Sequence, residues 1–173
     1  MTCGEASSSQ KTPAPAAAKL TTASKATDSK TTAAKVKILA TDASVKSGEE
    51  FCIDVKVSNF LEIVSMQYST NWDSKQLEYK GVKNFTVKDL NAKSFGRPAS
   101  EPNSFRFLWM AMDLNPVSLY DNSTIYQVCF KAIGKSGTTT KVEFTNKPIV
   151  VEVANIKMQK LGTELVPATI TIQ

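Results

Sequence analysis

The 173 residues include no histidine, and this absence excludes several classes of protein at once. Ser-His-Asp and Cys-His catalysis, histidine-ligated zinc and histidine-based pH switching all need an imidazole ring. Any enzyme chemistry would therefore have to rest on carboxylates and lysines. Long apolar runs are absent too, since the run that ends at Met112 is far too short to span a bilayer. The sequence thus points away from an enzyme and contains no membrane span.

A clustered basic stripe is also missing, although the net charge is +5. Residues 1–35 hold five of the 21 basic residues and only two of the 16 acidic ones, so much of the excess positive charge lies there. The rest of the chain is nearly balanced. Nucleic-acid binding needs a basic stripe with interleaved aromatic residues, and we therefore expect no nucleic-acid partner.

Residues 1–35 lack aromatic residues and consist mainly of Ala, Ser, Thr and Lys. Such a segment cannot bury enough apolar surface to offset the entropy lost on ordering, so we predict a flexible tether. No apolar secretion-signal core is present in it. Cys3 stands at its head, a layout that resembles bacterial lipoproteins, in which a mature N-terminal cysteine carries lipid. That interpretation requires Met1 and Thr2 to be foreign or removed, and the alternative is a free thiol.

From Val36 onward the hydrophobic pattern has a period of two, which is typical of β-strands. Apolar residues alternate with polar ones over 51–58, 64–69, 126–131 and 141–145, and Ile170 closes the pattern. Turn residues separate these runs, and no stretch shows helical periodicity over three turns. About eight or nine short strands predict an all-β fold, a sandwich of two packed sheets over residues 36–173.

The order of several short motifs resembles the cohesin family, the dockerin-binding modules of cellulosomes. The motifs are an acidic turn leading into a strand, a strand ending in Asn-Phe, an aromatic-Asp-x-x-x-Leu-Glu element and a late Phe-Lys-x-x-Gly strand; they stand here at 47–51, 57–60, 72–79 and 130–134. Trp72 replaces the tyrosine that is usual in the family. The resemblance covers residues 36–173 and implies a nine-stranded jelly-roll sandwich without catalytic activity or cofactor.

The resemblance also implies where a partner would dock, because cohesins bind with one sheet that includes the strands similar to 64–71 and 105–112. Ser65 and Gln67 fall where one class of cohesins carries an Asn and an Asp that bind the dockerin. Met112 falls where that class often has an acidic residue. All three positions depart from the pattern, so the partner's class does not follow. The alternative for 64–70 is an ordinary solvated strand face.

The strand 105–112 is apolar on both faces, with Leu108 and Met110 on one side, and Phe107 and Trp109 on the other. A strand of this kind is expected to be covered on both sides. The resemblance sets Phe107 and Trp109 on the docking side, where they would form a binding hot spot. In the alternative, these two rings face the core, and Leu108 and Met110 lie under a loop.

Cys52 and Cys129 occupy the polar faces of their strands by the same alternation. The resemblance makes these strands neighbours in one sheet, where directly opposed cysteines could form a disulfide. Such a bond would fit an extracytoplasmic site, and two free thiols are the alternative. No calcium-binding loop of the dockerin type occurs. Asp113 and Asp121 could share an ion, or they could be turn residues.

These observations favour a non-catalytic, cohesin-like recognition domain outside the cell, attached through a tether with a possible lipid on Cys3. Its expected partner is a dockerin-like module, and the calcium would reside in that partner. A carbohydrate-binding sandwich is the first alternative, with Phe105, Phe107 and Trp109 as a platform for polysaccharide. The second is a structural, adhesin-type surface domain, for which Phe107 and Trp109 would be buried.

Overall fold

The computed structural model describes residues 34–173 of the chain. Cys3 lies outside the described residues, and so does the predicted tether except for its last two residues. The described part contains twelve strands and one short 3-10 helix, which follow one another along the chain as β1 (Val36–Ala40), β2 (Ala43–Val45), β3 (Glu50–Ser58), β4 (Ile63–Trp72), β5 (Leu77–Lys83), η1 (Ala92–Ser94), β6 (Phe95–Gly96), β7 (Ser104–Met110), β8 (Ser123–Ala132), β9 (Thr138–Thr145), β10 (Glu152–Asn155), β11 (Thr163–Val166) and β12 (Ala168–Ile172).

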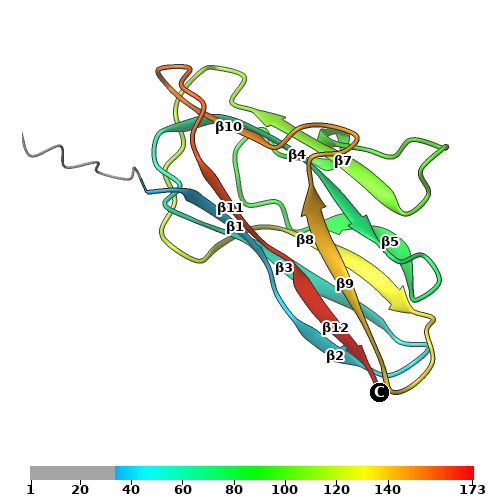
Figure 1. The fold of residues 1–173 in the computed structure, drawn as a ribbon. Helices are drawn as coiled ribbons and strands as arrows, with labels where there is room; N and C mark the ends of the chain where they lie inside the picture. Colours follow the sequence, from blue (N-terminus) through cyan, green and yellow to red (C-terminus); the bar gives the residue numbers. More distant parts are fainter. Residues whose placement is uncertain (1–33) are drawn as a thin grey trace, which may run out of the picture. The chain divides into compact units, whose positions relative to one another are not determined.

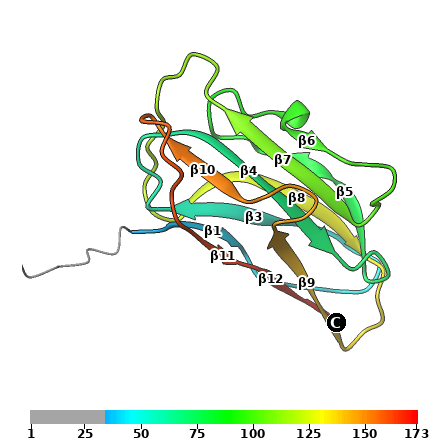
Figure 2. The same cartoon turned by 45° about the horizontal axis from the view of Figure 1, so that its top comes forward.

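The strands form two sheets that pack face to face, and the predicted two-sheet sandwich is confirmed (Figures 1 and 2). One sheet has five strands in the order β11-β1-β3-β8-β5. The other has seven, in the order β2-β12-β9-β4-β7-β6 with β10 paired to β4. Twelve strands replace the predicted nine because short segments such as β6 and β10 extend the seven-stranded sheet. Two to four residues are too few to show a period in the sequence.

The alternation of polar and apolar residues that was predicted for the long strands matches the alternation of exposed and buried side chains in the structure. In β4, Val64, Met66 and Tyr68 lie in the core, and in β3 the core residues are Ile53, Val55 and Val57. Because successive side chains of a strand point to opposite faces, each sheet lays one apolar face against the other. Aromatic rings fill the middle of this core, including Phe105, Phe107, Tyr126 and Phe130.

Two consecutive strands pair with the same edge of β4, and this arrangement shapes the outer face of the seven-stranded sheet. β9 pairs with the C-terminal part of β4 and β10 with its N-terminal part, while β7 pairs along its other edge. Between β9 and β10, the Ser69 hydroxyl accepts a hydrogen bond from the Ile149 N–H at 3.0 Å. This bond ties the β9–β10 connection to the centre of β4, so the outer face is continuous from β10 to β7.

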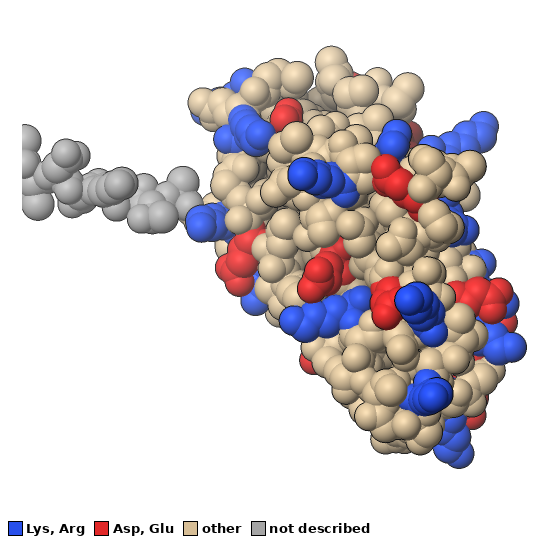
Figure 3. Space-filling view, turned by 45° about the vertical axis from the view of Figure 1, so that its right-hand side comes forward, with Lys and Arg blue, Asp and Glu red and all other residues tan. Residues whose placement is uncertain are grey.

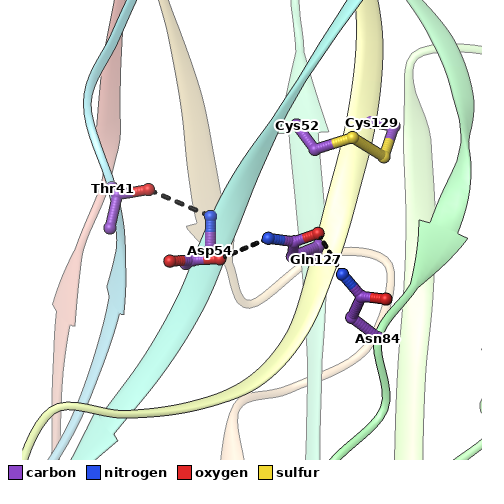
Figure 4. Close-up of a disulfide and its surroundings, with 6 residues drawn as sticks. All are labelled: Thr41, Cys52, Asp54, Asn84, Gln127 and Cys129. Atoms are coloured by element: carbon purple, nitrogen blue, oxygen red, sulfur yellow. Dashed lines mark hydrogen bonds between the residues drawn. A yellow bond between two sulfur atoms is a disulfide. The ribbon is translucent and has the colours of Figure 1, made fainter.

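The outer face of the five-stranded sheet carries a disulfide that joins Cys52 of β3 to Cys129 of β8 (Figure 4). The two cysteines are directly opposed in the β3–β8 ladder. Beside them the Gln127 amide donates a hydrogen bond to the Asp54 carboxylate at 2.8 Å and accepts one from the Asn84 amide at 2.6 Å. This face is therefore polar and covalently stapled.

Charged side chains of both signs are interspersed on the domain. Figure 3 shows one face on which basic and acidic groups lie next to one another instead of separating into patches. Several of them form exposed ion pairs, such as Lys80 with Glu78 at 2.9 Å. Residues 34–173 form no helix with the length and hydropathy that crossing a membrane requires.

Candidate functional site

The side of β7 that faces solvent is opposite to the side that the family resemblance predicted. Phe107 and Trp109 are 0% and 2% exposed, so the prediction that this pair forms the docking hot spot is wrong. Phe105 is also fully buried, and a platform of the three rings for a polysaccharide is therefore wrong as well. A partner at the surface cannot reach any of them.

Specific contacts explain why these rings face the core. Phe107 stacks on Tyr68 of the same sheet with the ring centroids 4.6 Å apart, and it also stacks on Tyr126 of the other sheet at 5.5 Å. The Trp109 indole N–H donates to the Lys88 carbonyl at 2.7 Å, so its polar atom needs no water. A buried tryptophan with a satisfied N–H is a stable arrangement. The interior holds both rings by packing and hydrogen bonding together.

Leu108 and Met110 instead point outward and are 57% and 50% exposed. The alternative prediction was right that the rings face the core, but wrong that a loop covers Leu108 and Met110. Two large apolar side chains on adjacent outward positions of one strand are unusual, because an antiparallel sheet usually places polar residues on its solvated face. Their exposure makes this face of β7 the first candidate for binding another molecule.

The register between β4 and β7 places small polar residues beside the two apolar ones. Ser65 is directly opposite Met110, and Gln67 is directly opposite Leu108. Across the other edge of β4, Glu152 of β10 stands opposite Gln67. Side chains at directly opposed positions have Cβ atoms about 5 Å apart. We call this surface the candidate face; it consists of Ser65, Gln67, Arg106, Leu108, Met110 and Glu152.

Hydrogen bonds hold part of the candidate face in place. The Gln67 amide donates to the Val150 carbonyl at 3.2 Å, which orients the side chain toward the β9–β10 connection. The Glu152 carboxylate pairs with Lys160 at 3.5 Å, and both side chains are well exposed. The Ser65 hydroxyl and the Arg106 guanidinium make no hydrogen bond or ion pair with the residues that the structure describes. These two groups can therefore bind a partner without first breaking a bond within the domain.

Met112 extends the apolar part of the candidate face. It is 77% exposed and lines a hollow of about 380 Å³ together with Leu108 and Met110. The opposite wall of this hollow comes from the segment around η1, including Asp89 and Asn91. The Met112 N–H donates to the Asp89 carboxylate at 3.1 Å, so the backbone at the end of β7 is fixed. Met112 thus lies beside Leu108 and Met110, and its contribution to binding stays a prediction.

The two loop acids considered for an ion serve as turn residues. Asp113 accepts a hydrogen bond from the Asn115 N–H at 3.1 Å and forms an ion pair with Lys88. Hydrogen bonds from Lys88 and Asn115 hold the pKa of the Asp113 carboxyl below its usual range. Asp121 accepts from the Asn59 N–H at 2.8 Å. Within residues 34–173, no three His, Cys, Asp or Glu side chains are grouped as a metal site would need.

One signal in the sequence could have identified Leu108 and Met110. Arg106 is the one polar residue of the run 105–112, and it is separated from Leu108 and from Met110 by an even number of positions. Residues an even number apart share a face of a strand, so a charged residue marks the face that meets solvent. The structure shows Arg106, Leu108 and Met110 exposed together.

Comparisons with known proteins agree with the observed fold. The cohesin domain family model matches residues 34–166. No curated protein matches the sequence. The OlpA cohesin of Clostridium thermocellum, solved in a cohesin–dockerin complex with Doc918, superimposes with a TM-score of 0.69 at 14% identity; the match covers 81% of this chain and all of that one.

Two further solved structures are similar to this chain. The cohesin CaCohA2 of Clostridium acetobutylicum has a TM-score of 0.66 at 18% identity, with 80% of this chain and 91% of that one covered. A non-cellulosomal cohesin of the archaeon Archaeoglobus fulgidus has a TM-score of 0.63 at 17% identity, with 81% and 92% covered. These TM-scores show the shared fold, and the family model covers most of the described residues. The chain belongs to the cohesin family.

Proposed function

We propose that this chain is a non-catalytic recognition module that is displayed outside the cell and binds a dockerin-type domain through the candidate face. Family membership supports a binding role, and OlpA is a relative solved with a dockerin bound. The calcium of the complex would belong to the dockerin. The disulfide on the other sheet supports an oxidising, extracytoplasmic location, since such bonds persist there.

The observation that carries this proposal is the outward position of Leu108 and Met110 next to Ser65 and Gln67. Because each apolar side chain already hides about half of its surface, complete burial under a partner would contribute about 1 kcal/mol from each. Small neighbours such as Ser65 leave room for a partner to approach the sheet closely. An apolar centre with a polar rim is the usual composition of a protein interface.

Arg106 adds a charged contact at the edge of the apolar pair. Its guanidinium has no acidic partner among residues 34–173, in contrast to Lys88 and Lys160, which are paired. A carboxylate on the partner would bind it with two parallel hydrogen bonds. We therefore expect the partner to present an acidic side chain next to an apolar patch.

Isothermal titration calorimetry of the full chain against a panel of dockerins in calcium tests the proposal. Leu108→Asp places a charge in the middle of the interface, and we expect a rise in Kd of at least about thirtyfold, which corresponds to about 2 kcal/mol. Leu61→Asp is the matched control, because Leu61 is similarly exposed, at 64%, but lies in the β3–β4 loop. Equal binding by both variants would contradict the candidate face. The absence of binding to any dockerin would contradict the proposed partner.

The anchoring of the domain is a separate proposal, because it does not follow from membership of the family. If Cys3 carries lipid and residues 1–35 act as a tether, the domain would stand off the cell surface with both sheets accessible. Mass spectrometry of the chain purified from its own membrane fraction would detect the added acyl mass. A free Cys3 thiol in that material would contradict the anchor and leave the docking proposal intact.

A further inference from the structure

A row of polar side chains crosses the outer face of the seven-stranded sheet at the end away from Met110. Asn71 of β4 stands directly opposite Glu143 of β9 on one side and Ser104 of β7 on the other. Ser104 is only 4% exposed, and its hydroxyl has no hydrogen-bond partner among residues 34–173. The side-chain carbonyl oxygen of Asn71 is also buried without a partner in that range. Buried polar groups normally have partners, so this pair needs an explanation.

Two adjoining hollows, of about 450 and 460 Å³, lie along this row and meet at Asn71 and Asn103. The unpartnered Ser104 lines the second hollow, and Glu143 lines the first. Because Asn71 lines both hollows and Ser104 lines the second, a single ligand spanning both would lie against the side chains that carry these two buried polar atoms. Their combined volume suits a molecule larger than one ring or one ion.

The charged side chains around the hollows are of both signs. Asp73, Glu101 and Glu143 are acidic, Lys141 and Lys147 are basic, and none of the five forms an ion pair within residues 34–173. The three carboxylates and two lysines nearly cancel, so charge alone strongly favours neither a simple cation nor a simple anion. Hydroxyl groups both donate and accept hydrogen bonds, so a molecule rich in them can satisfy every group in such a mixture.

We infer that these two hollows bind a neutral saccharide of about two sugar units. A sugar hydroxyl would donate to the Asn71 carbonyl oxygen, and a second would exchange a hydrogen bond with Ser104. Trp72 and Pro148 supply small apolar surfaces, but Trp72 is only 4% exposed and offers no broad ring for stacking. Without that stacking the affinity is modest, with a Kd on the order of 1–10 mM.

This site differs from the aromatic platform that the sequence suggested, because it uses polar side chains of β4, β7 and β9. It is also separate from the apolar part of the candidate face, since Ser69 and Arg106 form the row between them. The inference does not depend on a dockerin. A saccharide bound here would place the domain on polysaccharide or on a glycosylated surface while Leu108 and Met110 remain free.

A titration of the isotope-labelled full chain with cellobiose, xylobiose and maltose, followed by amide NMR, tests the inference. We expect at least one of these disaccharides to shift the side-chain NH2 signals of Asn71 and Asn103. Ser104→Ala should raise the Kd for the bound disaccharide by about two- to tenfold, which is the effect of losing one hydrogen bond. The variant should remain folded, because it removes a hydroxyl without a partner. Ser65→Ala on the candidate face is the control and should leave the Kd unchanged.

Two results would overturn the site. One is that the Asn71 and Asn103 signals do not shift when each of the three sugars is present at a concentration of roughly ten times the expected Kd. The other is that calcium chloride alone shifts the same signals, which would make the hollows a cation site. Because no dockerin is added, either result leaves the proposed function untouched, and loss of dockerin binding would leave the saccharide site untouched.

Discussion

The hydroxyl oxygens of Tyr68 and Tyr126 lie 2.9 Å apart in the middle of the sandwich, and each sheet contributes one of them. Both tyrosines are fully buried, so each hydroxyl has the other as its hydrogen-bond partner where water is excluded. Stacking of Tyr68 on Phe107 joins this polar pair to β7, the strand that carries Leu108 and Met110. The interior thereby fixes the position of the candidate face.

The first prediction concerns this hydroxyl pair. Tyr126→Phe leaves the Tyr68 hydroxyl buried without a partner, and we expect it to lower the free energy of unfolding by about 1–3 kcal/mol. The double variant Tyr68→Phe/Tyr126→Phe removes both groups and should lose less than the two single variants combined. Urea unfolding followed by tryptophan fluorescence measures all three. Strictly additive losses would contradict a hydrogen bond between the two hydroxyls.

The second prediction concerns alkaline pH. Burial raises the pKa of Tyr68 and of Tyr126 above the ordinary value, so both stay protonated in the folded state where an unfolded tyrosine would ionise. The stabilisation from this difference is complete below about pH 10 and is lost as the pH rises further. A spectrophotometric titration should show a late tyrosinate step that the double phenylalanine variant lacks. An unchanged titration curve in that variant would contradict this prediction.

The third prediction concerns the disulfide. Cys52 and Cys129 are 77 residues apart, and the chain-entropy relation gives about 4.5 kcal/mol for closing a loop of that length. Cys52→Ala/Cys129→Ala should therefore unfold at a lower urea concentration. The bond lies on the sheet opposite the candidate face, so dockerin affinity below the unfolding transition should not change. A parallel loss of affinity would show that the two faces are coupled.

The fourth prediction concerns the loop that follows β7. Lys88 lowers the pKa of the Asp113 carboxyl by a hydrogen bond and by its charge, with a further contribution from Asn115. Lys88→Met should raise that pKa, and hydrogen bonds from Asn115 should keep it below the ordinary value. Since a depressed pKa stabilises the fold above the unfolded pKa, the contribution is lost as the pH falls. Carboxyl NMR titration measures the midpoint, and an unchanged midpoint would contradict the ion pair.

The sequence predicted the features that depend on strict alternation. Over 51–58 and 64–69 polar and apolar residues alternate without ambiguity, and the structure buries the apolar set in each strand except Phe51, which is partly buried. The direct opposition of Cys52 and Cys129 could also be predicted as one of two alternatives, because the family resemblance made their strands neighbours. These features depend on one strand, or on one pair of strands.

The strand 105–110 was harder because apolar residues occupy both of its faces. A period of two does not say which set of alternate residues faces the core when both sets are apolar. The choice depends on packing partners such as Tyr68 and Tyr126, which come from two other strands. The polar hollows could not be predicted from the sequence either. The pairing of β4 with β7 and β9 brings their lining residues together, including Glu101, Ser104, Glu143 and Lys147.

Methionine methyl NMR tests the central claim most directly, because the chain has methionines both on the candidate face and in the core. Addition of a dockerin in calcium should shift or broaden the methyl signals of Met110 and Met112. Met66 is buried in β4, and its signal should change least. If a bound dockerin leaves the signals of Met110 and Met112 unchanged, the partner docks elsewhere and the account of this face is wrong.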